Sequence, residues 1–306
     1  MISIQSTVVK FIAKYYVRPG YYPDLDVNRL RKTDVKSPSA TLVRGCTREM
    51  KTINGVDCTI LTPSNQTSNR ILIYIHGGGY VSGPNKMHWK MLANICRKTG
   101  NKAILVNYGL APESSCLNSI EDVISVYNNL ISEINASEIY FLGDSAGGGL
   151  SLATILKLKE DRKPLPAALI LLSPFLDMTL SNPEIENIEP YDTVLYKKGL
   201  QDVGKIYAGD FDLSHPFLSP INGNLEGLPP TLLLIGTHDI FLSDCRKFRD
   251  KAKKSGIRLT YKEWDKMFHL WMLVVSLVPE ANKAVKTIVN FITATIESPK
   301  VTSHIR

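Results

Sequence analysis

A serine enclosed by glycines is the residue of this chain whose type and setting best suit covalent chemistry. It is Ser145, in the run GDSAG at 143–147, with an apolar segment before it and small residues at helical spacing after it. The pattern predicts a strand that turns sharply at the serine and becomes a helix, with glycines where a Cβ would meet backbone. A hydroxyl is a poor nucleophile near neutral pH, so it needs a base, an orienting acid and donors for developing negative charge. The alternative is a structural serine in a glycine-rich turn.

The base should come from one of six histidines. In an open α/β sheet the reacting groups gather beyond the carboxyl ends of the strands, so a partner of Ser145 should follow a strand. His269 does so, after residues 265–268 and before the final helix, and is the predicted base. A partly buried structural histidine is the alternative for it. The other histidines are expected to have other places. His76 should fix the backbone of its loop, and His238 should point away from Ser145. The helix, the insertion junction and the tail should hold His88, His215 and His304, in that order.

The orienting acid should be held at a rigid strand end. Asp239 ends the penultimate predicted strand and is the predicted acid. Asp244 is better explained as an acid in the first turn of the next helix, where it meets the helix dipole. Asp144, beside the nucleophile, is expected to point away from Ser145 and brace the loop.

Negative charge that forms during attack needs backbone N–H donors aimed at one point. The three consecutive glycines at 77–79 follow a predicted strand, and glycines present their N–H groups with nothing in front of them. The predicted donors are Gly78 and Gly79, with Ala146 at the positive end of the following helix. A phosphate-binding loop is the competing interpretation of 76–83. It fails because neither G-x-x-x-x-G-K-[ST] nor G-x-G-x-x-G occurs, and no acid is placed for a ribose.

Alternating apolar runs and helical segments predict the scaffold that would position these residues. Residues 46–53 and 56–61 flank Asn54-Gly55, a hairpin signal, and should form an antiparallel edge. Later strands are expected at 71–75, 103–106, 138–142, 168–172, 231–235 and 258–264, with helices between them. We therefore predict an α/β fold with a mostly parallel sheet of about eight strands flanked by helices. Residues 177–215 carry no buried strand and are predicted as an insertion over the sheet.

The composition is that of an ordinary globular protein, with 44% hydrophobic and 21% charged residues and a net charge of +7. The densest basic patch, residues 246–258, alternates with apolar positions and indicates a solvated helix face. Nucleic acid or an anionic membrane surface is the alternative partner for it. Five scattered cysteines without a C-x-x-C pair indicate free thiols in a reducing compartment and no metal site.

The N-terminal segment, residues 1–22, is basic and has no acid before Asp24. A transit peptide is one interpretation of this segment. An amphipathic helix is the other, and its apolar face would consist of Val8, Phe11, Ile12 and Tyr15. The longest apolar run, 270–279, is too short to span a bilayer, so we expect a cytoplasmic protein without a transmembrane segment.

Six short motifs occur in a fixed order: HGGG at 76–79, Y-x-LAPE at 108–113, GDSAGG at 143–148, SPF-x-D at 173–177, G-x-x-D at 236–239 and M-x-H at 267–269. Together they resemble the hormone-sensitive-lipase family of α/β-hydrolases, from about residue 45 to the C-terminus. Residues 114–116 and 240–244 depart from the family's frequent pattern, which leaves the shape of the pocket open.

The resemblance implies an α/β-hydrolase fold with a helical cap. It implies a serine carboxylesterase in which Ser145 is the nucleophile, His269 the base and Asp239 the acid. The implied oxyanion hole is built from Gly78, Gly79 and Ala146. The implied division of the chain is an N-terminal cap segment at 1–45, a catalytic domain at 46–176 and 216–306, and a cap insertion at 177–215.

We accordingly expect hydrolysis of short- to medium-chain acyl esters through an acyl-enzyme, with no metal or organic cofactor. Six aromatic side chains are predicted to line the substrate pocket: Tyr80, Phe175, Tyr191, Tyr207, Phe211 and Phe217. The alternatives are an amide-directed hydrolase (an arylacetamide deacetylase-like enzyme or a peptidase) and a non-catalytic small-molecule receptor on the same fold. The expected partner is a small-molecule ester and not nucleic acid, and a homodimer is left open. The apolar run 270–275 is expected in the core or a pocket wall, with a dimer interface or a lipid-facing patch as alternatives.

Overall fold

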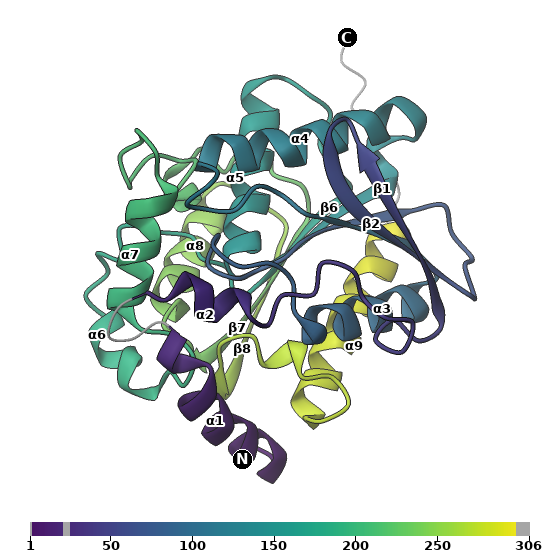
Figure 1. Cartoon of the computed structure of the whole chain (residues 1–306). Coiled ribbons are helices and arrows are strands. Elements are labelled where there is room, and N and C mark those ends of the chain that lie inside the picture. Colours follow the sequence, from purple (N-terminus) through teal and green to yellow (C-terminus); the bar gives the residue numbers. More distant parts are fainter. Residues whose placement is uncertain (1, 21–24, 298–306) are drawn as a thin grey trace.

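The predicted strands form one eight-stranded sheet in the computed structural model, which describes residues 2–20 and 25–297 (Figure 1). The strands are β1 (Cys46–Ile53), β2 (Val56–Pro63), β3 (Ile71–Ile75), β4 (Lys102–Val106), β5 (Ile139–Asp144), β6 (Ala168–Leu172), β7 (Thr231–His238) and β8 (Leu259–Phe268). Their order across the sheet is β1-β2-β4-β3-β5-β6-β7-β8. β1 and β2 form an antiparallel hairpin, β2 is antiparallel to β4, and the later pairings are parallel. The predicted sheet with an antiparallel edge is confirmed.

Helices cover both faces of the sheet. They are α1 (Ile4–Tyr16), α2 (Val27–Arg31), α3 (Lys86–Thr99), α4 (Cys116–Glu133), α5 (Ala146–Glu160), α6 (Ile185–Ile188), α7 (Lys197–Tyr207), α8 (Leu242–Lys254) and α9 (Pro279–Glu297). Short 3₁₀ turns are η1 (Arg18–Gly20), η2 (Ala136–Glu138), η3 (Glu189–Tyr191), η4 (Pro220–Asn222) and η5 (Trp271–Leu273). Successive strand residues point to opposite faces, so β3 sends Ile73 and Ile75 into the core under α4, α5 and α8, and Leu72 and Tyr74 into the core under α3 and α9.

Two segments outside this layered core pack against each other. α1 and α2 precede the sheet, and α6, η3 and α7 lie between β6 and β7 at one side of the molecule (Figure 1). The Arg18 guanidinium, just after α1, lies 3.7 Å from the ring centre of Tyr196 and donates to the carbonyl oxygen of Glu189. The start and the middle of the chain therefore meet above the body.

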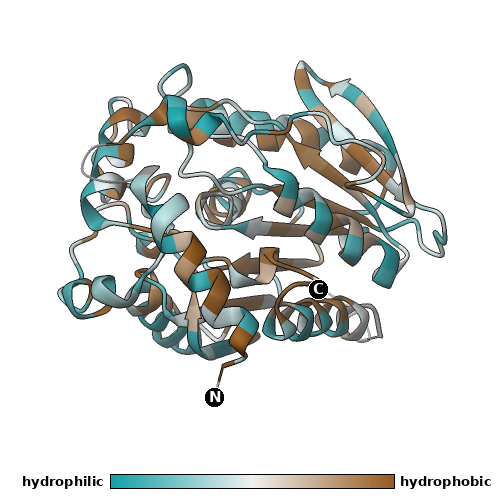
Figure 2. Cartoon of the chain, turned by 60° about the horizontal axis from the view of Figure 1, so that its bottom comes forward, coloured by the Kyte–Doolittle hydropathy of each residue, from teal (hydrophilic) through white to brown (hydrophobic). Residues whose placement is uncertain are grey.

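The helix α1 forms as predicted, but most of its expected packing face is turned outward. The exposed fractions of Val8, Phe11, Ile12 and Tyr15 are 52%, 64%, 48% and 56%. Figure 2 shows α1, beside the N-terminus, with much of its ribbon coloured as hydrophobic. The inward side is held by polar contacts instead. Glu280 accepts hydrogen bonds from Ser3 and Ser6, and the Lys10 ammonium contacts His238. These contacts select the orientation that apolar periodicity alone does not give.

The apolar run after His269 is buried, since residues 271–275 are at most 8% exposed. The expectation that it belongs to the core or a pocket wall is confirmed. All five cysteines are free thiols, as predicted. Among the described residues no helix combines the length and the apolar character that a bilayer crossing requires.

Candidate active site

Ser145 stands at the carboxyl edge of the sheet, between the last residue of β5 and the first residue of α5. Its φ of 49° and ψ of −121° are a strained conformation for a residue with a side chain. Close packing holds the strain: a Cβ on Gly147 would collide with the carbonyl oxygen of Ile75, so only glycine lets α5 approach β3. The GDSAG run thus forms the predicted strand-to-helix turn and presents the hydroxyl of Ser145 at the sheet edge.

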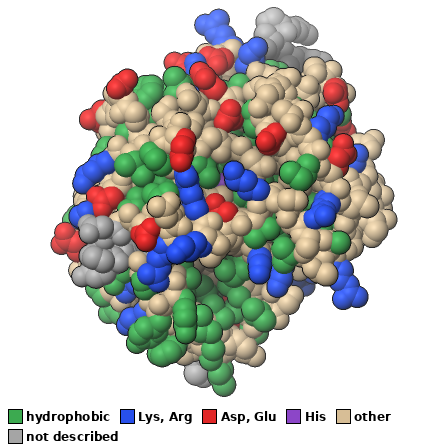
Figure 3. All heavy atoms as spheres, in the orientation of Figure 1, with side chains coloured by type: hydrophobic (Ala, Val, Ile, Leu, Met, Phe, Trp, Pro, Cys, Tyr) green, Lys and Arg blue, Asp and Glu red, His purple; other side chains and the backbone are tan. Residues whose placement is uncertain are grey.

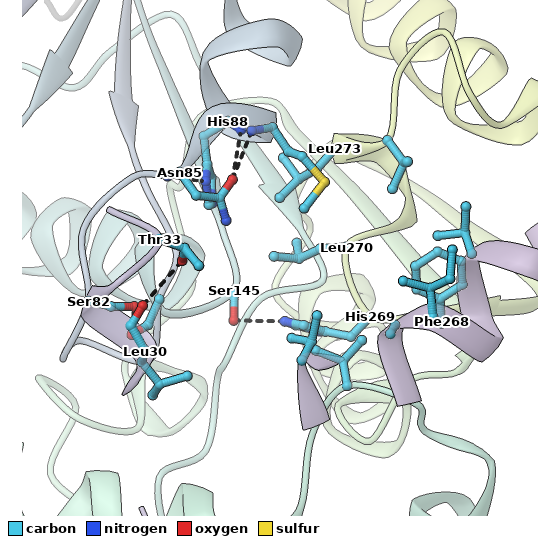
Figure 4. A pocket seen from close by; sticks show the side chains of 18 of the residues that line it. Leu30, Thr33, Ser82, Asn85, His88, Ser145, Phe268, His269, Leu270 and Leu273 are labelled. Atoms are coloured by element: carbon cyan, nitrogen blue, oxygen red, sulfur yellow. Dashed lines mark hydrogen bonds between the residues drawn. The ribbon is translucent and has the colours of Figure 1, made fainter. Parts of the chain in front are cut away.

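His269 and Asp239 each follow a strand end directly, β8 and β7 respectively. The strand β8 is longer than predicted, so residues 265–268 are strand and not a loop before His269. The Nε2 atom of His269 lies 2.9 Å from Oγ of Ser145 (Figure 4), and its Nδ1 atom lies 2.9 Å from Oδ2 of Asp239. With Nδ1 protonated, the imidazole donates to Asp239 and accepts the serine hydroxyl hydrogen. The structure brings the three residues into one buried hydrogen-bonded chain.

Carboxylates around His269 set its protonation. Burial disfavours the imidazolium form, but the charge and hydrogen bond of Asp239 outweigh burial, with smaller contributions from Asp192 and Asp144. Together they raise the pKa of His269 above its ordinary value of 6.5. A histidine in this setting is a strong base for the serine proton when it is neutral.

Asp192 is a residue of this site that sequence reasoning missed. It is fully buried at the end of η3, and its Oδ1 accepts the N–H groups of Val194 and Leu195 at 2.7 and 3.0 Å. Its Oδ2 accepts the N–H of Ile240, the residue after Asp239, at 2.9 Å. Burial, and then the charge of Asp239, raise the pKa of Asp192 to about 6. Asp192 thus ties the 177–215 segment to the loop that carries the acid, and only the fold reveals this contact.

The glycine loop after β3 faces Ser145. Gly78 and Gly79 have φ values of 121° and 62°, and a Cβ on Gly78 would collide with the carbonyl oxygen of Ser82. Within residues 2–20 and 25–297, the N–H groups of Gly78, Gly79 and Ala146 donate to no protein acceptor. Gly78 borders the same cavity as Ser145. These N–H groups are therefore available to an oxygen that develops negative charge.

His76 fixes the backbone of the glycine loop, in agreement with the prediction. Its Nδ1 lies 2.8 Å from the carbonyl oxygen of Gly77, and its ring stacks on Tyr108 with centres 4.6 Å apart. Burial lowers the pKa of His76 to about 4, so the ring is neutral at ordinary pH. A neutral, stacked imidazole holds the loop and leaves proton transfer to His269.

Asp144 braces the loop from beneath, as predicted. It accepts a hydrogen bond from the Tyr74 hydroxyl, and its Oδ2 lies 3.3 Å from Nε2 of His88. His88 lies on α3, as expected, but it also borders the cavity at Ser145. Its place in an Asn85–His88 capping box was the available signal, because the box fixes the direction of the imidazole.

An apolar cavity of about 340 Å³ opens at Ser145 and His269 (Figure 4). α1 supplies one wall and the segment after His269 supplies another, with α2, the glycine loop and the start of α3 between them. The main apolar lining residues are Val9, Ile12 and Ala13 from α1, Val17 just after it, and Leu270, Leu273, Val274 and Leu277 from the segment after His269. The N-terminal helix therefore forms part of the candidate substrate site.

The six aromatic residues predicted to line the pocket do not border this cavity. Tyr80 and Tyr207 stack with centres 3.9 Å apart, Phe175 stacks on Phe241, and these side chains are almost fully buried. Phe211 and Phe217 pack on His215, and Tyr191 is exposed beside His238. Stacking fills the space beside Tyr80, Phe175 and Tyr207, and the Tyr80–Tyr207 pair packs α7 against the body.

The remaining described candidates lie away from Ser145, and His304 lies outside the described residues. His238 turns toward Lys10, whose Nζ lies 2.7 Å from its Nδ1. Asp244 lies in the first turn of α8, where Asn182 donates to its Oδ1. In the described part of the chain no group of three or more His, Cys, Asp or Glu side chains is arranged to hold a metal ion.

Comparison with known proteins places this fold and site in a family. The family described as alpha/beta hydrolase fold matches residues 72–273. An esterase of Acinetobacter venetianus is 32% identical over 230 residues, which are 74% of this chain and 76% of the relative. An acetyl-hydrolase of Streptomyces hygroscopicus is 31% identical over 240 residues, 78% and 80% of the two chains. The chain belongs to the α/β-hydrolase fold family.

A solved structure identifies the branch of this family. It is an esterase from the bacterial hormone-sensitive lipase family, and it superposes with a TM-score of 0.87 at 28% identity over 97% of this chain and 99% of its own. The resemblance to hormone-sensitive-lipase esterases is confirmed, and with it the enzyme class, a carboxylic ester hydrolase.

Proposed function

We propose that this protein hydrolyses carboxylic esters through an acyl-enzyme formed on Ser145. His269 takes the hydroxyl proton as the serine attacks the ester carbonyl, and then gives it to the leaving alcohol. The same histidine next removes a proton from the water that releases the acid. Asp239 keeps the imidazole oriented and stabilises its charged form. The observation that supports this proposal is the chain of two 2.9 Å contacts from Ser145 through His269 to Asp239.

The tetrahedral intermediate needs donors for its oxyanion, and we assign them to the N–H groups of Gly78, Gly79 and Ala146. Their freedom from protein acceptors and the glycine-only backbone of the loop support this assignment. The N-terminus of α5 adds a positive end at the same point. Removing one such donor typically slows a serine hydrolase by about 100- to 1,000-fold, which shows how much these hydrogen bonds contribute.

Covalent labelling tests the nucleophile. A fluorophosphonate probe followed by peptide mapping should give one adduct, on Ser145, and Ser145→Ala should lose both the adduct and esterase activity. Ser82→Ala is the matched control, because Ser82 is the other serine that borders the cavity. This variant should still be labelled on Ser145. Full esterase activity in Ser145→Ala would overturn the assignment. Matched ester and anilide substrates with the same acyl group test the amide-directed alternative, which predicts substantial turnover of the anilide.

Short to medium acyl chains are the substrates that we propose. The cavity of about 340 Å³ lies near the lower end of the range of roughly 300–1,000 Å³ for small-molecule sites. The name of the acetyl-hydrolase relative, at 31% identity, supports a short acyl group. A series of nitrophenyl esters measures the preference, and a maximum at about twelve carbons or more would contradict it.

A wall substitution tests whether this cavity holds the acyl chain. Ala13→Phe places a ring in the cavity, so the ratio of butyrate to acetate hydrolysis should fall by about tenfold. Tyr191→Ala, on the exposed aromatic outside the cavity, should leave this ratio unchanged. Equal effects of the two substitutions would place the acyl site elsewhere.

This proposal has three further parts. The first is a cytoplasmic location, and the second is the division of the chain into 1–45, 46–176 with 216–306, and 177–215. The third is the homodimer that the sequence leaves open. Five free thiols support a reducing compartment. The contact of Arg18 with Tyr196 and Glu189 supports treating the two outer segments as one cap. Fractionation of cells, limited proteolysis at the segment borders and sedimentation velocity test the three points separately.

A further inference from the structure

The outer side of α1 is an apolar ridge made of Ile4, Val8, Phe11 and Tyr15. These residues recur on one helical face, and each is more than half exposed. The rings of Phe11 and Tyr15 lie 4.7 Å apart, and Figure 3 shows hydrophobic side chains gathered over this end of the molecule. A contiguous apolar surface of this kind is a mark of an interaction site.

A cationic groove of about 700 Å³ begins at the end of α1, which contributes Tyr16 and Val17 to its lining. Its charged border consists of four exposed cations, Arg29, Lys32, Lys86 and Lys90. No ion pair among the described residues involves any of the four. Asp34 is the acid of the lining, and its carboxylate accepts the N–H of Gly83. In Figure 3, Lys and Arg side chains accordingly lie above the hydrophobic end.

The groove is continuous with the cavity at Ser145. Val17, Leu30, Thr33, Asn85 and Met87 border both spaces. The two sides of α1 face different spaces: its inner residues line the cavity, and its outer residues form the apolar ridge. Whatever occupies the ridge and the groove therefore lies next to the entrance of the candidate active site.

We propose that the apolar ridge and the cationic groove dock together on an anionic phospholipid surface. The ridge enters among the acyl chains, and the groove cations lie at the level of the headgroups, which is the arrangement of an interfacial amphipathic helix. A second copy of the chain fits this face less well, because a twofold contact would set the cations against their own equivalents. Delivery of membrane-dissolved esters to Ser145 is a consequence that rests on the proposed esterase function, whereas docking itself does not.

Sedimentation with vesicles tests the docking surface. The full chain should bind vesicles of phosphatidylglycerol and phosphatidylcholine, should bind pure phosphatidylcholine vesicles much less, and should dissociate partly with added salt. Phe11→Ser with Tyr15→Ser should weaken binding by about tenfold, and Lys86→Glu with Lys90→Glu by a similar factor. These side chains lie outside the cavity lining, so hydrolysis of a water-soluble acetate ester should be unchanged in both variants.

Two controls isolate the surface. Met50→Ser removes an exposed apolar side chain on β1, and Lys253→Glu with Lys254→Glu reverses charge on the basic helix α8; both should bind like the parent. Ser145→Ala should also bind like the parent, which separates docking from catalysis. The proposal is overturned if the parent does not bind anionic vesicles, if the ridge variant binds unchanged, or if the α8 variant weakens binding equally. A dimer in solution that the ridge variant abolishes, without vesicle binding, would identify a second copy as the occupant instead.

Discussion

Negative charge around the imidazole of His269 determines how activity should depend on pH. Attack by Ser145 needs the neutral imidazole, and burial favours that form, but Asp239 and its neighbouring carboxylates raise the pKa of His269 above 6.5. As the pH falls through this raised value, His269 gains a proton and the serine loses its base. We therefore expect kcat/KM to fall on the acid side with an apparent pKa above 6.5. A pH profile with a soluble ester measures it, and an acid limb below 6.5 would contradict the charge arrangement.

Asp192 provides a sharper test of the same arrangement, as a positioning residue that acts through Asp239 and His269. Asp192→Asn removes one of the charges that raise the pKa of His269, so the acid limb should shift toward lower pH. The amide of the asparagine has one acceptor oxygen, whereas the carboxylate has two, so one hydrogen bond from a backbone N–H beside Asp239 is lost. A loss of about 1 kcal/mol should lower kcat by about fivefold.

Asp202→Asn is the control for this change, because it removes a carboxylate from α7 that pairs with Lys198 and Lys205 at the surface. Its pH profile should match that of the parent. An acid limb that stays in place in Asp192→Asn would show that Asp192 braces the cap without influencing the base.

How far residues can be assigned from sequence depends on whether their role follows from the chain's local pattern. Ser145, Asp239 and His269 could be proposed because each follows a predicted strand, and parallel strands deliver their carboxyl ends to one edge. Asp192 and the cavity wall at Ala13 could not be, since they reach the site from segments without strand periodicity. The aromatic residues were misplaced for a related reason: hydrophobic type does not distinguish a stacked core ring such as Tyr207 from a pocket wall.

At the scale of elements, α2 is fastened by Arg31. Its Nε donates to the carbonyl oxygen of Val81 at 2.7 Å and its Nη2 to that of Ala111 at 2.9 Å, while Glu113 accepts from both terminal nitrogens. Arg31→Ala leaves two carbonyl groups of buried residues unpaired, so it should lower the free energy of unfolding by about 1–3 kcal/mol. Chemical denaturation with a constant m value measures the change.

Glu113→Gln is the informative companion of Arg31→Ala. The side chain of Glu113 is 64% exposed, so the ion pair itself should add little in water, and the amide can still accept from Arg31. Its effect on stability should be smaller than that of Arg31→Ala. An equal loss in the two variants would mean that the ion pair, and not the two backbone carbonyl bonds, holds α2.

The same scale shows why the sheet was easier to predict than the cap. A central strand such as β3 is buried on both faces, so its sequence is a short, continuous apolar run that is typical of a parallel strand. α1 has apolar residues around much of its circumference, so periodicity identifies a helix but not which side packs. The contacts of Ser3, Ser6 and Lys10 settle the orientation, and their partners, Glu280 and His238, lie more than two hundred residues away.

Across the whole molecule, distant parts of the chain meet at the candidate active site. The first helix walls the cavity, and Glu280 at the start of α9 holds that helix by accepting from Ser3 N at 2.7 Å, Ser3 Oγ at 2.8 Å and Ser6 Oγ at 2.8 Å. Burial opposes the charge of Glu280, but these hydrogen bonds outweigh it and lower the pKa of its carboxyl to about 2. The carboxylate is therefore ionised, and a strong acceptor, over the working range of an esterase.

Loss of this acceptor should release α1 and open the cavity. We expect Glu280→Ala to raise KM for a butyrate ester by about fivefold with little change in kcat, because the wall is lost while Ser145, His269 and Asp239 keep their own contacts. Trypsin should cut faster at Lys10 and Lys14, which α1 otherwise protects. Glu280→Gln, which retains one acceptor oxygen, should be intermediate, and Glu133→Ala, on an exposed acid of α4, should behave like the parent. Faster cleavage of α1 with an unchanged KM would show that the helix lines the cavity without contributing to substrate binding.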